Sequence, residues 1–127
     1  MTGDTLLLRQ IHPTFVQQGR VTSQAFRPTP KDENRLSVYD GDMIQPEPAW
    51  QHYTMSLGFS SIGVMAVSHA ECGALDLPVE PDPEPFPEHA VINFSALQKN
   101  EIEKRAKKLR THAEARDWLF RYVTTAP

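Results

Sequence analysis

Residues 95–123 read SALQKNEIEKRAKKLRTHAEARDWLFRYV, and this stretch predicts one long helix. Apolar residues recur in it at helical spacing and form a stripe that we expect to face the core: Ile102, Ala106, Leu109, Ala113 and Phe120. Asn100 and Glu103 have the spacing of a capping box. Ser95 is an equally suitable earlier cap, so the sequence leaves the first helical residue open.

The predicted helix is basic, and the rest of the chain is acidic. The helix holds eight of the thirteen Lys and Arg residues but only four of the sixteen Asp and Glu residues. The net charge of −3 is therefore the sum of two opposite charges on two parts of the chain. The most concentrated bases are Lys104, Lys107, Lys108 and Arg110. Segregated charge favours a protein partner whose surface complements one of the two parts.

An acidic segment at residues 78–88, PVEPDPEPFPE, contains five prolines and four carboxylates. This composition predicts an extended surface loop without regular structure, because proline lacks the backbone donor of a helix or a ladder. The carboxylates of Glu80, Asp82 and Glu84 could bind a partner. The economical interpretation is that they contact the chain's own basic helix.

Five further segments have the composition of short strands: residues 5–11, 21–27, 36–39, 60–68 and 90–94. Residues 46–57 predict a short helix, with prolines in its first turn and Gly58 just beyond its end. The pattern predicts a single α+β domain over residues 1–127. We expect a small mixed or antiparallel sheet of about five strands, packed by the short central helix and the long C-terminal one.

The composition excludes several classes of site. A single cysteine, Cys72, allows no internal disulfide and no multi-cysteine zinc site. His52, His69 and His89 lack the spacing of metal ligands, so we expect no metal and no cofactor. The first residues lack the pattern of a secretory signal, and no apolar run reaches the length of a membrane span, which favours a cytoplasmic protein.

One set of residues suggests an enzyme. Arg9, Ser37 and Tyr39, together with a glutamate such as Glu71 or Glu88, are the residue types that an ADP-ribosyltransferase-like site uses around NAD. The arginine would pair with the phosphates and the glutamate would orient the ribose. This alternative predicts that Arg9, Tyr39 and one glutamate surround a single cleft.

The leading hypothesis is a small, non-catalytic binding or accessory protein that acts through a protein partner. A bacterial toxin-neutralising or defence-system component is one form that it could take. No P-loop, G-x-G-x-x-G or G-x-S-x-G motif is present, so the common nucleotide-binding and hydrolase classes lack their signatures. A third hypothesis is weak nucleic-acid binding along the basic helix, although the overall acidic balance argues against it.

Overall fold

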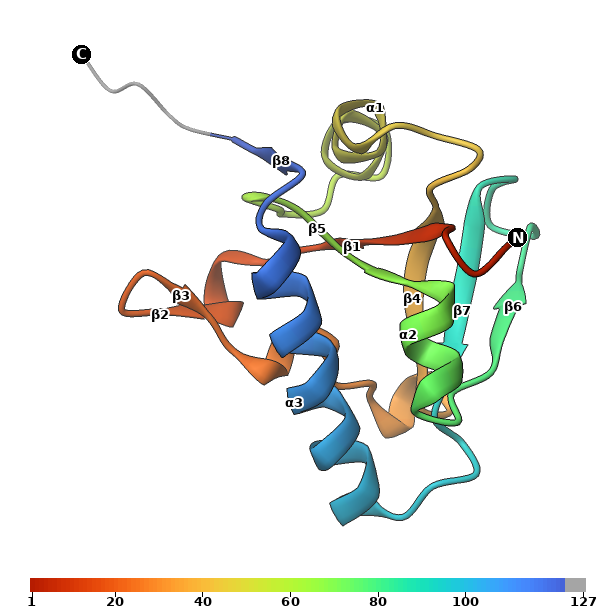
Figure 1. Ribbon diagram of the computed structural model, residues 1–127. Coiled ribbons are helices and arrows are strands. Elements are labelled where there is room, and N and C mark those ends of the chain that lie inside the picture. The colour runs from red at the N-terminus through yellow and green to blue at the C-terminus, as the bar shows by residue number, and fades with distance from the viewer. Residues whose placement is uncertain (123–127) are drawn as a thin grey trace.

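An antiparallel sheet of six strands organises the computed structural model, which describes residues 1–122 (Figure 1). Its strands, in spatial order, are β6 (Val79–Pro81), β7 (His89–Asn93), β4 (Arg35–Asp40), β1 (Leu6–Gln10), β5 (Gly63–Ser68) and β8 (Phe120–Arg121). A separate hairpin is formed by β2 (Val16–Gln17) and β3 (Arg20–Val21). The predicted α+β class is confirmed, with six strands in the main sheet where about five were expected.

Helices cover the two faces of the sheet. The long helix α3 (Lys99–Arg116) and the short helix α2 (His69–Ala74) pack on one face, while α1 (Pro46–Gln51) lies on the other (Figure 1). A π-helical turn, His52–Ser56, continues α1 up to Gly58, which has a positive φ of 75° as expected for the residue after a helix. Three 3-10 turns complete the structure: Pro13–Phe15, Ser23–Phe26 and Pro30–Asp32.

Side chains alternate between two separate apolar clusters, as the period of two in a strand requires. Leu7 of β1 belongs to the cluster under α3, and its neighbour Leu8 belongs to the cluster under α1. Every residue of β5 is buried, because this strand is covered on both faces. The nearly continuous apolar run at residues 60–68 therefore predicted a buried strand correctly. No helix within residues 1–122 is long and apolar enough to cross a membrane.

The long helix is shorter than predicted at both ends. It begins at Lys99, where the Glu101 carboxylate accepts a hydrogen bond from the Gln98 amide (3.1 Å), so the capping spacing lies two residues before Asn100 and Glu103. It ends at Arg116, because Asp117 has a left-handed φ of 71°. The chain then forms β8, in which Phe120 pairs with Val64 of β5.

The predicted stripe is correct within the shorter helix, where four of its members are buried: Ile102, Ala106, Leu109 and Ala113. Phe120 is instead a strand residue. Val123, the last residue of the predicted helix, lies outside the described residues.

Residues 21–27 are not the predicted strand. Only Val21 is in a strand, and Ser23–Phe26 forms a 3-10 turn. Ala25 and Phe26 are both fully buried next to α3, and two adjacent residues on one face are incompatible with a period of two. The Arg110 side chain fixes the turn by donating from Nε to the Val21 carbonyl (3.1 Å).

The proline-rich segment contains regular structure, contrary to the prediction. Val79–Pro81 forms edge strand β6, which pairs with β7. The backbone amides of Asn93 and Asp82 donate to the carbonyls of Pro78 (2.8 Å) and His89 (2.9 Å). Proline is tolerated there because an edge strand needs donors on one side only.

Candidate functional site

A cavity of about 590 Å³ opens on the α1 face of the sheet, within the size range of small-molecule sites. Its floor is formed by side chains of three adjacent strands: Leu8, Gln10, Ser37, Tyr39 and His89. Its walls come from three loops or turns: Asp32, Tyr53, Leu57, Phe59, Pro85 and Phe86. Arg9 reaches it from one side. Rigid strands therefore position the polar groups, and the connecting segments enclose them.

Arg9 enters the cavity because β1 and β4 separate. The two strands pair only at Leu7 and Leu8, and beyond Leu8 the ladder ends. The Arg9 guanidinium occupies the side of this opening, where Nε donates to the Ala25 carbonyl (2.7 Å) and Nη1 donates to the Ser37 carbonyl (3.0 Å). A guanidinium carries five N–H donors, so others remain free to face a ligand.

The charge of Arg9 is poorly compensated within the described chain. Burial lowers the pKa of the guanidinium to about 10, with nearby Tyr53 and Asp32 opposing the shift. No carboxylate of residues 1–122 lies within ion-pair distance of Arg9. The Asp32 carboxylate instead accepts a hydrogen bond from the Thr29 hydroxyl (2.9 Å). Arg9 is half-buried, and a partly buried cation without a paired anion is the kind of group that clusters at functional sites.

Gln10 is a second uncompensated polar group. The residue is 5% exposed and lines the cavity floor, and neither its amide nitrogen nor its amide oxygen has a protein hydrogen-bond partner. Buried side-chain amides are normally hydrogen-bonded, since an unsatisfied one costs about 1–3 kcal/mol. The Gln10 amide can therefore both donate to and accept from a molecule in the cavity.

Aromatic side chains form the rest of the enclosure. Tyr39 packs on Phe86 with ring centroids 4.9 Å apart, and Tyr53 packs on Phe59 at 5.1 Å. Burial, followed by nearby Tyr53 and Glu88, raises the pKa of Tyr39, so its hydroxyl stays neutral and bonded to His52 Nδ1 (2.8 Å). Phe59 is 56% exposed at the rim. Such walls suit a planar apolar group.

A smaller, polar cavity of about 260 Å³ adjoins the first and shares Asp32, Ser37 and His89 with it. Lys31 and Arg35 line it. The Arg35 Nη2 donates to Glu80 (3.0 Å), while its buried Nε has no partner. The two cavities together place an aromatic compartment next to a polar one.

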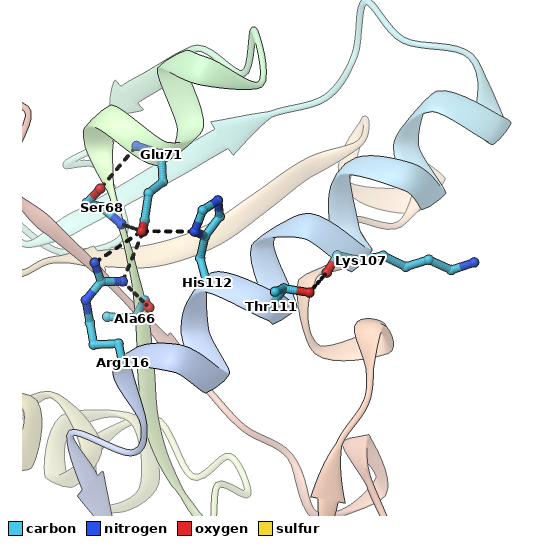
Figure 2. Close-up of polar contacts among 7 residues, drawn as sticks. All are labelled: Ala66, Ser68, Glu71, Lys107, Thr111, His112 and Arg116. Carbon is cyan, nitrogen blue, oxygen red and sulfur yellow. Dashed lines mark hydrogen bonds and ion pairs between the residues drawn. The ribbon is translucent and has the colours of Figure 1, made fainter.

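Three of the five residues proposed for the enzyme alternative do meet in the cavity, namely Arg9, Ser37 and Tyr39. Glu88 is close enough to contribute to the raised pKa of Tyr39, but it does not line the cavity. Glu71 lies on the α3 face in an ion-pair cluster with Arg116 (3.0 Å) and His112 (3.1 Å), drawn in Figure 2. The cavity lining therefore lacks the glutamate that this alternative requires.

The Glu71 cluster has a structural role. Glu71 accepts a hydrogen bond from the Ser68 amide (2.7 Å) at the start of α2, in a capping box that was not predicted from the sequence. Its carboxylate also accepts from Arg116, which donates in addition to the Ala66 carbonyl (3.0 Å) (Figure 2). The cluster thus ties α2 and α3 to β5.

The predicted contact between acidic segment and basic helix is not formed. Glu80 pairs with Arg35, and Asp82 approaches His89, both near the β6 edge of the sheet. Glu84 is exposed. Helix α3 packs on the other half of the sheet, against β5. The acidic segment therefore lies at the β6 edge of the sheet, away from α3, which packs on one face near β5 (Figure 1).

The basic residues of α3 fall into two groups. Lys104, Lys107 and Lys108, called the basic row below, are exposed, and no carboxylate of residues 1–122 pairs with them. Figure 2 shows Lys107 extending away from the Glu71 cluster. Arg110 is different, because it is half-buried and pairs with Glu114 (3.2 Å).

No three His, Cys, Asp or Glu side chains of residues 1–122 gather as ligands. Burial raises the pKa of Cys72 to about 12, so this fully buried thiol is not a nucleophile.

Gln10 was not among the residues predicted for a site, and His89 was not assigned to a pocket. The available signal for Gln10 was its place in the mostly apolar run of residues 5–11, since glutamine is usually exposed and a buried one is informative. Nothing in the sequence fixed the register that sets His89 beside Ser37. The comparisons with known protein families, curated proteins and solved structures found no match for this chain.

Proposed function

We propose that the protein binds a small anionic molecule with an aromatic or apolar part in the cavity. The observation that carries the proposal is the Arg9 guanidinium, which is held at the cavity without a carboxylate in ion-pair distance. An anion there would pair with this half-buried charge. The aromatic walls and the Gln10 amide suit the remainder of such a ligand.

The test compares matched anionic and neutral probes by thermal shift and calorimetry. Phenyl phosphate and benzoate are paired with phenol and benzamide. We expect the anions to bind more tightly to the wild type by about tenfold or more, since a hydrogen bond to a charged group contributes about 1.5–3 kcal/mol. Arg9→Met should lose this preference, and Arg27→Met, at an exposed position outside the cavity, should keep it. Equal binding of anionic and neutral probes contradicts the proposal.

The nucleotide-using alternative is tested in the same assay with NAD. Release of nicotinamide would support an ADP-ribosyltransferase-like activity despite the absence of a glutamate from the cavity lining. Binding without release would support the binding function instead.

The basic row supports a second candidate function, binding of an acidic protein partner. Its three lysines share one exposed side of α3 and have no carboxylate partner within residues 1–122. A pull-down with the Lys104/Lys107/Lys108→Glu variant beside the wild type tests it. A stoichiometric protein lost only in the variant would support this surface. Retention of nucleic acid instead would favour the third hypothesis. The role as a toxin-neutralising or defence component remains a prediction.

A further inference from the structure

Ser37, His89 and Asp82 form a connected chain of contacts at the junction of the two cavities. Ser37 Oγ lies 3.2 Å from His89 Nε2. On the other side of the ring, His89 Nδ1 lies 2.9 Å from the Asp82 carbonyl and 3.4 Å from the Asp82 carboxylate. A hydroxyl, an imidazole and a group that orients the imidazole are the parts of a nucleophile–base pair.

The partners of His89 determine its tautomer. The Asp82 carbonyl oxygen can only accept, so the neutral imidazole must carry its proton on Nδ1. Nε2 then presents its lone pair to Ser37, and the Ser37 hydroxyl donates to it. This is the direction in which a general base removes the proton of an attacking hydroxyl.

The sheet register positions the pair, and the Ser37 side of it is accessible. Ser37 stands opposite Val91 in the sheet and His89 stands opposite Tyr39, so the two are diagonal neighbours on one face. His89 is 9% exposed and packs edge-on against Phe86 at 5.1 Å between ring centroids. Ser37, by contrast, is exposed and lines both cavities.

Hydrogen-bond donors lie in the same cavity. The Arg9 guanidinium donates to the backbone carbonyl of Ser37, the residue that carries the hydroxyl. The Gln10 amide has no protein partner. Fixed donors of this kind stabilise the oxyanion that forms when a hydroxyl adds to a carbonyl.

We propose that Ser37 and His89 hydrolyse an ester whose acyl part carries an anionic group. This inference rests on the proposed anion site at Arg9. Ser37 Oγ bonds to the ester carbonyl carbon while its proton passes to His89 Nε2. The alcohol then leaves with that proton and its bonding pair, which gives an acyl-Ser37. Water adds in the same way, with His89 as base, and releases the carboxylic acid and free Ser37. Asp82 is a positioning residue for His89.

The test uses 4-nitrophenyl hemisuccinate, which carries an anionic acyl group, and neutral 4-nitrophenyl acetate. We expect hydrolysis of both, with kcat/KM for the hemisuccinate higher by about tenfold or more, as one charged hydrogen bond implies. Ser37→Ala and His89→Gln should each lower kcat/KM by about 100-fold or more. A fluorophosphonate probe should label Ser37, located by peptide mass spectrometry. A preference for the neutral ester would overturn the substrate class.

Control variants separate this site from adventitious catalysis, because any accessible imidazole hydrolyses activated esters slowly. Ser60→Ala and His12→Gln, both outside the cavity, should hydrolyse both esters at the wild-type rate. Activity that survives Ser37→Ala, or that falls equally in His12→Gln, would overturn the assignment of the nucleophile and base.

Anion binding is measured separately on the Ser37→Ala protein. Both proposals are supported if this variant still binds phenyl phosphate but no longer hydrolyses the nitrophenyl esters. Wild-type binding of the anions without hydrolysis overturns the catalytic inference alone. Labelling and Ser37-dependent hydrolysis without any anion preference would overturn the binding proposal and the substrate class, and would leave the nucleophile assigned.

Discussion

On the α3 face of the sheet, apolar side chains fill the space and the polar groups at its margin are paired, as the Glu71 cluster illustrates. At the cavity on the α1 face, the Gln10 amide has no protein hydrogen-bond partner, and the Arg9 guanidinium, which reaches the cavity from one side, has no carboxylate of residues 1–122 in ion-pair distance. One face thus supplies stability, while the other holds polar groups at a cost. Proteins commonly carry such a cost at sites that bind or react, where a ligand supplies the missing partners.

The largest expected difference between the faces concerns packing. Leu109→Ala removes a fully buried side chain under α3 and should lower the free energy of unfolding by about 2–5 kcal/mol. Leu57→Ala, at the partly exposed rim of the cavity, should change it by about 0.5 kcal/mol or less. Urea unfolding of both variants measures the contrast. Similar losses would mean that the cavity wall is as tightly packed as the core.

A gain in stability is expected on the α1 face. Gln10→Leu keeps the volume but removes the unpartnered amide, and should raise the free energy of unfolding by about 1–3 kcal/mol. The variant should also bind the anionic probes less tightly. Gln51→Leu, at an exposed position of α1, serves as the control and should change stability little. A less stable Gln10→Leu protein would show that the amide is hydrogen-bonded in solution, and the contrast between the faces would fail.

The smallest effect should come from the Glu71 cluster. Burial alone would raise the pKa of Glu71, but the hydrogen bonds from Arg116 and Ser68 and the charges of Arg116 and His112 outweigh it and hold the pKa below its usual 4.5. The stabilisation is therefore complete above pH 4.5 and is lost as the pH falls through the lowered pKa.

Glu71→Gln should cost up to about 1 kcal/mol at neutral pH and nothing once the wild-type carboxylate is protonated. Urea midpoints of wild type and variant, followed from neutral to acidic pH, should converge. Glu84→Gln, at an exposed position, should follow the wild type throughout. Parallel curves for wild type and Glu71→Gln would remove the electrostatic explanation.

The sequence predicted the α3 face better than the cavity, for a physical reason. Burial leaves a periodic signal, and the spacing of Ile102, Ala106 and Leu109 located the core side of α3 correctly. The end of that helix depends on Asp117, which has a positive φ, and on the pairing of Phe120 with Val64 of β5. Contacts with residues far away in the chain carry no local pattern.

The cavity was only partly predictable. Arg9, Ser37 and Tyr39 were chosen by residue type, and the structure brings them together. Glu71 failed to join them because the capping box with Ser68 places it on α2, on the opposite face. The contact between Ser37 and His89 depends on the β4–β7 register, which unites residues more than fifty positions apart.

The position of β8 has a consequence for biosynthesis. Gly63 and Val64 pair on their outer side with Arg121 and Phe120, which a ribosome makes nearly sixty residues later. Until then, the outer edge of β5 exposes backbone donors and acceptors together with strongly apolar side chains, a combination that promotes association between chains. A nascent chain paused before Phe120 should therefore depend on chaperones, and recruitment of chaperones should end once residues 120 and 121 have left the exit tunnel.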